Sequence, residues 1–183
     1  DRSATFQNYK EILDIVKPYL EKKQIAYKFI ENEEDIYKVF SVHEIAAECG
    51  KFITIYPSQT IILIVLEDLY QLLRYKDGIY ILSDRPYKDS NLVFYRFGLL
   101  HDSTNVYKDG IPTLVNLNGE EWQDYPKPYF DLPSWIEDIQ PPQEENNESY
   151  LGSHYEVAEV LHQSGGGNVY HGDDKKFNTS VIL

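Results

Sequence analysis

Two arginines lie at the edges of predicted strands, where they could bind an anion. Arg85 belongs to the segment SDRP (83–86), and Arg96 belongs to YRFG (95–98). A guanidinium group is planar and carries several N–H donors, so it can hold a phosphate through paired hydrogen bonds. Ion pairs with carboxylates explain the same residues equally well, because the chain contains 30 Asp and Glu residues. The arginines therefore predict either a phosphate fork or two ion pairs.

A lysine at the start of an apolar strand is the candidate for proton transfer. Lys51 follows a glycine in the segment CGKFITIYP (49–57). A lysine that lies near other cations and is partly removed from water favours its neutral amine, which can act as a general base. A solvated lysine at a strand end is the commoner situation.

A run of glycines forms a third feature. Gly165, Gly166 and Gly167 lie between two strand-like segments, 155–161 and 168–171. Glycines between two strands allow backbone N–H groups to approach phosphates closely, as in the lid over the nucleotide of a protein kinase. The third glycine of the full G-x-G-x-x-G pattern is missing at its usual spacing, so the run by itself favours a simple hairpin loop.

Composition excludes several classes of protein. Seventeen basic and 30 acidic residues give a net charge of −13, which argues against a nucleic-acid partner. A hydrophobic fraction of 42% is enough for a core, and the single cysteine excludes an internal disulfide framework. With no signal peptide, these properties predict a cytoplasmic protein. The longest apolar run, 61–66, is too short to cross a bilayer, so we expect no membrane partner.

Hydrophobic periodicity predicts an α+β fold with a mixed, largely antiparallel sheet and packed helices. Residues 5–23 have helical spacing, with Pro18 predicting a kink or an early stop, and a second helix is predicted from Ser58 to about Leu73. Asn118–Gly119 is a predicted hairpin turn. Strands are predicted at 25–30, 36–42, 52–56, 79–82 and 92–97.

The last quarter of the chain has a different character. Residues 141–149 are polar and read as a linker, which separates a first domain, 1–140, from a strand-rich segment, 150–183. A third strand of that segment is predicted from Thr179. The chain contains no methionine and begins at Asp1, so we expect it to be part of a longer polypeptide.

Five motifs, in order, resemble the N-terminal part of class III and class IV lanthipeptide synthetases. They are GKFITIYP (50–57), YILSDRP (80–86), FYRFG (94–98), LPSW (132–135) and LHQSGGGNVYHG (161–172). The resemblance implies that the first domain is a phospho-Ser/Thr lyase. It implies that 150–183 are the first strands of a kinase N-lobe, with the rest of the kinase domain and a cyclase domain on the same polypeptide.

The resemblance also implies a reaction and its residues. The lyase would eliminate phosphate from a phosphorylated precursor peptide to give dehydroalanine or dehydrobutyrine, without a cofactor. Lys51 would be the base, and Arg85 and Arg96 would bind the phosphate. Lys28 would be a further phosphate contact, although a solvated strand position explains it more simply. ATP or GTP with Mg would serve the kinase part, and Gly165, Gly166 and Gly167 would cover the nucleotide.

One position departs from the family pattern. The family has a Lys-x-His motif whose histidine donates a proton to the leaving phosphate, and Asp1 stands at that histidine position. An ionised aspartate would repel phosphate. An alternative function is therefore a catalytically impaired lyase-like module that binds the leader peptide or docks the kinase domain. A free-standing acidic interaction protein is a third, weaker interpretation, which leaves the five motifs unexplained.

Overall fold

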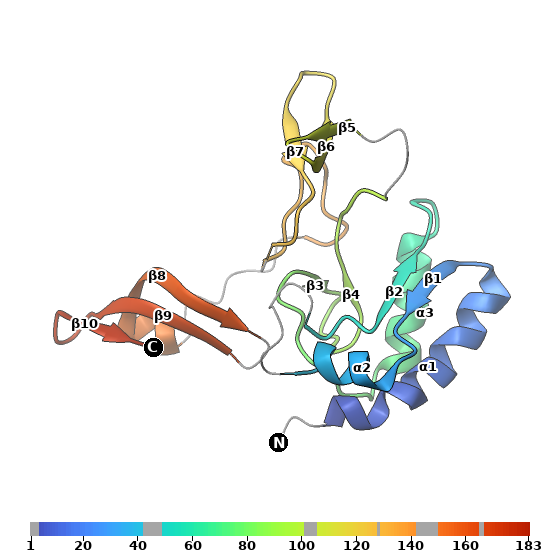
Figure 1. Cartoon of the computed structure of the whole chain (residues 1–183), viewed down its shortest axis with the longest axis horizontal. Helices are drawn as coiled ribbons and strands as arrows, with labels where there is room; N and C mark the ends of the chain where they lie inside the picture. Colours follow the sequence, from blue (N-terminus) through green and yellow to red (C-terminus); the bar gives the residue numbers. More distant parts are fainter. Residues whose placement is uncertain (1–3, 42–48, 101–105, 128, 142–149, 165–166) are drawn as a thin grey trace.

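The fold combines helices with small antiparallel sheets, which confirms the predicted α+β class (Figure 1). The computed structural model describes residues 4–41, 49–100, 106–127, 129–141 and 150–183, apart from 165–166. The described strands form four separate sheets of two or three strands each, where the sequence had predicted one larger sheet. All described strands before residue 130 are only two to five residues long, so each pairing forms few backbone hydrogen bonds.

Helix α1 (Ala4–Lys23) supplies one wall of the core. It packs with α3 (Ile62–Leu73), and Val16 and Leu20 are 1% and 0% exposed. The helix continues through Pro18, so the predicted early stop is wrong; burial on both sides of the proline outweighs the lost backbone hydrogen bond. No helix in the described part of the chain is both long and apolar enough to cross a membrane.

Strands β1 (Ala26–Phe29) and β2 (Ile53–Tyr56) form an antiparallel pair, with Lys28 opposite Thr54. The rings of Tyr27 and Phe29 stack with centroids 6.1 Å apart. The Lys17 ammonium lies 4.5 Å from the Phe29 ring, so this face of β1 is turned toward α1. Neighbouring residues of a strand alternate between its faces, which leaves Lys28 on the exposed face.

Helix α2 (Glu33–Val39) corrects a sequence prediction, because residues 36–42 had been predicted as a strand. The Asn32 side chain accepts a hydrogen bond from the Glu34 N–H at 2.9 Å and caps the helix. Acidic residues fill the first turn, where they interact favourably with the helix dipole. Ile36 is 0% exposed, so the short helix is anchored in the core.

We expect the Asn32→Ala substitution to lower the free energy of unfolding by about 1 kcal/mol, because it removes the N-cap of α2. Asn32→Asp keeps an acceptor oxygen and is the control, with an expected loss close to zero. Chemical denaturation of the three proteins measures the difference. Equal stability of Asn32→Ala and the parent chain would contradict the capping role.

Helix α3 (Ile62–Leu73) begins four residues after the predicted cap, Ser58. The Ser58 hydroxyl bonds the Thr60 hydroxyl at 2.9 Å, and its carbonyl accepts the Ile61 N–H at 3.1 Å. These bonds make a turn that precedes the helix. The buried residues of α3 form its core-facing side: Val65, Leu66, Leu69 and Leu73.

A short ladder joins β3 (Arg85–Pro86) to β4 (Phe94–Tyr95), with Arg85 opposite Tyr95. The predicted strands at 79–82 and 92–97 are therefore wrong in extent. Residues 79–82 are not a strand, and only 94–95 of the second segment pair. The backbone at Gly78 approaches Asn91 closely, but the two segments do not pair as strands there.

Strands β5 (Val106–Lys108), β6 (Ile111–Val115) and β7 (Glu121–Gln123) form an antiparallel sheet. The predicted hairpin turn at Asn118–Gly119 is confirmed between β6 and β7. The Asn116 side-chain oxygen accepts the N–H groups of Asn118 and Glu120 and holds the turn.

The last elements confirm the three strands predicted near the end of the chain. Helix α4 (Tyr150–His154), which the sequence did not predict, leads into β8 (Tyr155–Ser164), β9 (Gly167–Asp174) and β10 (Thr179–Ile182). These strands form an antiparallel sheet in the order β10-β9-β8. In Figure 1 this sheet extends away from α1, α2 and α3.

Candidate active site

The backbone conformation at residue 50, directly before Lys51, requires a glycine. Gly50 has a φ of +81°, a left-handed conformation that side chains other than glycine rarely adopt. Its N–H donates to the Val39 carbonyl at 2.9 Å, and its carbonyl accepts the Phe52 N–H at 3.1 Å. Lys51 therefore follows a tight turn that is hydrogen-bonded to the end of α2, and it lies shortly before β2.

Lys51 forms a largely buried ion pair with Asp84. The Lys51 Nζ lies 3.1 Å from the Asp84 Oδ1, and the two side chains are only 16% and 13% exposed. The Ser83 hydroxyl donates to the same carboxylate at 2.7 Å. Lys51 is thus largely removed from water and held by its carboxylate partner. To act as a base, it must first leave this ion pair.

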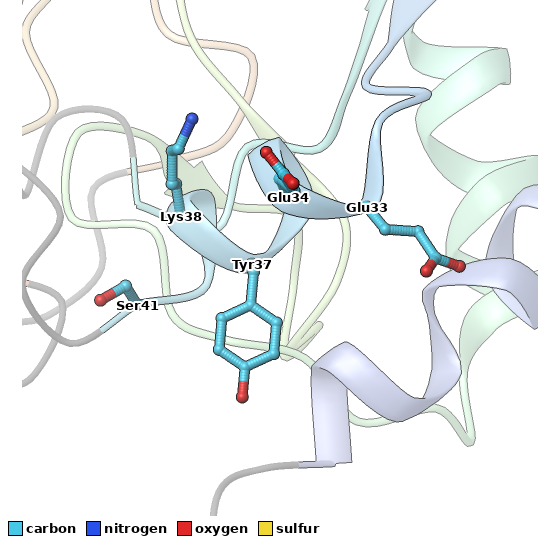
Figure 2. Close-up of a pocket in the computed structure, with 5 residues that line it drawn as sticks. All are labelled: Glu33, Glu34, Tyr37, Lys38 and Ser41. Atoms are coloured by element: carbon cyan, nitrogen blue, oxygen red, sulfur yellow. The ribbon is translucent and has the colours of Figure 1, made fainter.

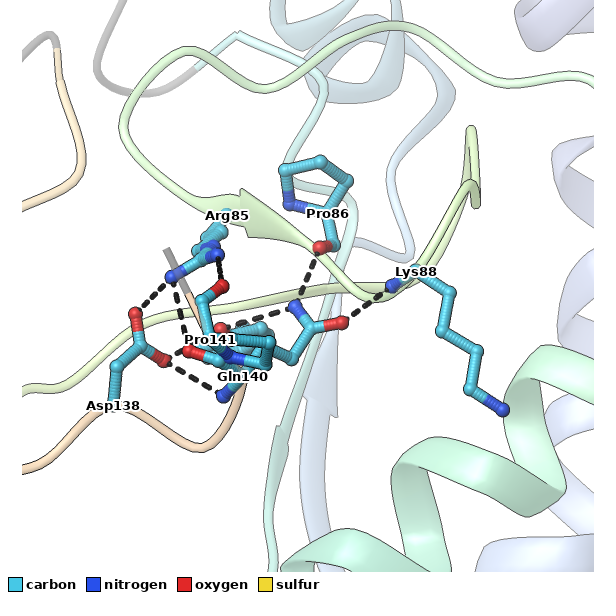
Figure 3. A network of polar contacts seen from close by, with 7 residues as sticks. Arg85, Pro86, Lys88, Asp138, Gln140 and Pro141 are labelled. Carbon is cyan, nitrogen blue, oxygen red and sulfur yellow. Dashed lines mark hydrogen bonds and ion pairs between the residues drawn. The ribbon is translucent and has the colours of Figure 1, made fainter. Parts of the chain in front are cut away.

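Arg85 contacts residues 138–141, more than 50 positions further along the chain (Figure 3). Its Nη1 pairs with the Asp138 carboxylate and donates to the Gln140 carbonyl at 3.4 Å. Its Nη2 donates to the Pro141 carbonyl. The Tyr95 hydroxyl donates to the second oxygen of Asp138 at 2.6 Å. Arg85 and Tyr95, which face each other in the β3–β4 ladder, therefore share one carboxylate.

The electrostatics of this cluster favour a charged Asp138 and a neutral Tyr95. Burial raises the pKa of Tyr95 to about 12, and its hydrogen bond to Asp138 acts in the same direction. Burial also raises the pKa of Asp138, but the hydrogen bonds from Tyr95, the Gln140 N–H and Arg85 outweigh it. The net pKa of Asp138 lies below its usual value.

Arg96 has a different partner. Its Nη2 lies 2.8 Å from the Asp124 Oδ1, and its Nε donates to the Phe97 carbonyl at 3.3 Å. The Leu99 N–H donates to the other Asp124 oxygen at 2.7 Å. Arg96 directly follows Tyr95, so both arginines belong to the β3–β4 region but bind separate carboxylates. The ion-pair interpretation of the two arginines thus describes their contacts, and a phosphate would have to compete with both aspartates.

The three cations lie around one short ladder. Arg85 is paired with Tyr95 across it, Arg96 follows Tyr95, and Lys51 reaches it through Asp84, the residue before Arg85. Lys28 lies on the exposed face of β1 and makes no ion pair with any described residue.

Of the three predicted nucleotide-binding glycines, the structure describes Gly167 alone. Gly167 is the first residue of β9 and pairs with Ser164 at the end of β8. Gly165 and Gly166 lie outside the described residues. An antiparallel strand pair joined at glycines is the backbone arrangement that a lid over phosphates requires, and the nucleotide-binding role stays a prediction.

Sequence reasoning missed the acidic partners of the site. Asp84 could have been found from the sequence, because it belongs to the SDRP motif beside Arg85. Asp124 and Asp138 could not have been found in this way, because they lie 28 and 53 residues from the arginines they bind. No local pattern distinguishes these two from the other acidic residues of the chain.

A surface hollow of about 520 Å³ lies beside α2, apart from these residues (Figure 2). It is lined by Glu33, Glu34, Tyr37, Lys38 and Ser41. Glu33 pairs with Lys10 at 2.6 Å, and Lys38 pairs with Asp35 at 2.8 Å. None of the predicted site residues lines this hollow, and Glu33 and Lys38 pair with residues outside it. In the described residues, no cluster of three or more His, Cys, Asp or Glu side chains could hold a metal ion.

The fold and the site define an α+β domain with three cation–carboxylate pairs gathered near one strand ladder. Residues 2–150 match the family model described as RamC, N-terminal domain, and the chain belongs to this family. It is also similar to a probable SapB synthase from Streptomyces coelicolor (strain ATCC BAA-471 / A3(2) / M145). The two are 27% identical over 188 residues, which cover 99% of this chain and 20% of that protein. The chain thus spans about a fifth of the length of the relative it matches.

Acid is expected to destabilise the domain through its carboxylates. Burial raises the pKa of Asp131, but hydrogen bonds from Lys127 and Trp122 outweigh this and leave it below its usual value. A carboxyl group whose pKa is lower in the folded state than in the unfolded state stabilises the fold at any pH above its unfolded-state pKa of about 4. This stabilisation is lost as the pH falls through the folded-state pKa. We expect the melting temperature to fall from about pH 5 to pH 3. Asp131→Asn should show a smaller fall; an equal or larger fall would contradict this contribution.

Proposed function

We propose that this chain is the phospho-Ser/Thr lyase domain of a lanthipeptide synthetase. It would remove phosphate from a phosphorylated precursor peptide by β-elimination. Membership of the RamC N-terminal domain family and the similarity to a probable SapB synthase support a role in lanthipeptide-type biosynthesis. The observation that supports the lyase proposal is that Arg85 lies in the β3–β4 ladder, while Arg96 and Asp84, the partner of Lys51, lie next to it in an otherwise acidic chain.

The elimination balances without a cofactor. A base takes the Cα proton, the Cα–H electrons form the Cα–Cβ double bond, and the Cβ–O bond breaks. The phosphate leaves with that electron pair. Phosphoserine gives dehydroalanine and phosphothreonine gives dehydrobutyrine. In this proposal Lys51 takes the proton, and Arg85 and Arg96 stabilise the charge that develops on the departing phosphate.

The buried ion pair sets a condition on this mechanism. A general base needs a free electron pair on its nitrogen, and the Lys51 amine is held in the ion pair with Asp84. The proposal therefore requires that the Lys51–Asp84 pair opens or passes on its proton when substrate binds. Lys28 is the alternative base, because no carboxylate of a described residue pairs with it. In our leading assignment Lys28 remains a further phosphate contact.

The remaining parts of the proposal concern the longer polypeptide. Residues 150–183 would open a kinase domain that uses ATP or GTP with Mg, with a cyclase domain on the same polypeptide. The kinase would phosphorylate the precursor peptide, and the lyase would act on the product. Gly165, Gly166 and Gly167 would contribute backbone N–H groups to the nucleotide phosphates.

The direct test incubates the 183-residue chain with a peptide that carries one phosphothreonine. Mass spectrometry should show loss of phosphoric acid, and a thiol should add to the new double bond. The same peptide without phosphate is the control and should stay unchanged. Phosphopeptide or leader-peptide binding without elimination would overturn the lyase and favour the alternative, an impaired module that binds leader peptide or docks the kinase.

A further inference from the structure

The Asp138 carboxylate occupies a position built for an anion. One of its oxygens pairs with the Arg85 guanidinium, and the other accepts the Tyr95 hydroxyl at 2.6 Å. Its side chain is only 18% exposed, and that of Arg85 is 13% exposed. A cation and a hydroxyl that converge on two oxygens of one group form the contacts that a phosphomonoester also accepts.

The residues after Asp138 hold it in this place (Figure 3). The Gln140 side-chain NH₂ donates to the Pro86 carbonyl at 3.0 Å and to the Tyr95 hydroxyl at 3.1 Å. The Gln140 side-chain oxygen accepts the Lys88 N–H at 2.7 Å. Together with the bond from Arg85 to the Pro141 carbonyl, these contacts fasten residues 138–141 across the β3–β4 ladder.

We propose that residues 138–141 form an internal plug, in which Asp138 takes the place of a phosphate between Arg85 and Tyr95. A phosphorylated residue displaces Asp138 and gains both contacts, so Tyr95 becomes a phosphate-binding residue. That the ligand is a phosphopeptide rests on the proposed function. That Asp138 occupies an anion position does not depend on the proposed function. A phosphate carries more negative charge and more acceptor oxygens than a carboxylate, which allows it to win this exchange.

The plug lowers the apparent affinity for the phosphate. Only the fraction of molecules with Asp138 displaced can bind, so the apparent dissociation constant increases by the inverse of that fraction. The Asp138→Asn substitution removes the competing negative charge but keeps an oxygen that can accept a hydrogen bond from the Tyr95 hydroxyl. Binding should therefore become tighter, although a native ion pair has been lost.

The test measures binding to the 183-residue chain by calorimetry, with inorganic phosphate and with a phosphothreonine peptide as probes. For Asp138→Asn we expect about tenfold tighter binding of both probes. Gln140→Ala, which loosens the plug without touching the carboxylate, should act in the same direction to a smaller extent. Tyr95→Phe keeps the ring against Phe130 but removes the hydroxyl, and should weaken binding.

The matched control is Asp131→Asn. Asp131 is also a partly buried carboxylate, bound by Lys127 and by the Trp122 ring N–H, but it does not contact Arg85. Its substitution should leave both affinities unchanged. Unchanged or weaker binding by both Asp138→Asn and Gln140→Ala would overturn the plug, as would binding of neither probe by any variant. Tighter binding without elimination by any variant would support the plug and reject the lyase.

Discussion

Lys51→Arg is expected to reduce the rate of phosphate elimination by about 10²–10⁴-fold, the usual contribution of a general base. Arginine keeps the positive charge and can keep the ion pair with Asp84, so the fold and phosphopeptide affinity should be retained. It cannot lose its proton near neutral pH, and so it cannot take the Cα proton. Single-turnover mass spectrometry on a phosphothreonine peptide measures the rate, and calorimetry measures the affinity.

This substitution avoids a complication of Lys51→Ala. Alanine would leave the Asp84 carboxylate buried without its partner, which typically costs about 3–5 kcal/mol and could unfold the domain. The matched control is Lys10→Arg, because Lys10 pairs with Glu33 at the surface and lies outside the proposed machinery. An unchanged rate in Lys51→Arg would reject Lys51 as the base. Loss of activity in Lys28→Arg instead would assign that role to Lys28.

Gly78→Ala is expected to destabilise the domain by about 3 kcal/mol, at the upper end of the range for overpacking. A Cβ on residue 78 would lie 2.2 Å from the Asn91 carbonyl oxygen and 2.5 Å from a Leu92 methyl group. The first contact is with backbone, so no side-chain rotation relieves it. Residues 91 and 92 lead into β4, so the strain should also disturb Tyr95 and Arg96.

The control for this substitution is Gly119→Ala, at the turn between β6 and β7. A Cβ there meets no atom within 4 Å, and only the backbone strain of a φ of +81° remains, about 1–2 kcal/mol. Urea denaturation gives both free energies of unfolding, and phosphopeptide affinity reports on β4. Equal stability of Gly78→Ala and Gly119→Ala would show that the chain accommodates the close approach at residue 78 at little cost.

Local patterns predicted much of the secondary structure. The periodicity of α1, the apolar strands β1 and β2, the Asn118–Gly119 turn and the strands after residue 150 follow from short stretches of sequence. For residues 36–42 the local pattern gave a wrong prediction, a strand. Ile36, Val39 and their neighbours suit a strand by type, but the Asn32 cap and the acidic first turn favour a helix, which buries Ile36 equally well.

By itself the sequence determined which residues could do chemistry, because Lys51, Arg85 and Arg96 stand in short motifs that can be read locally. The order of those motifs along the chain also predicted a lanthipeptide-type family, which the match to the RamC N-terminal domain family supports at that coarser level. Only the tertiary structure decided what these cations contact. Asp138 and Asp124 reach Arg85 and Arg96 across 53 and 28 residues, and Asp84 reaches Lys51 from a different strand segment. Such pairs arise when packing brings distant segments together, and the free energy that selects one carboxylate among 30 acidic residues depends on burial and geometry that no local pattern contains.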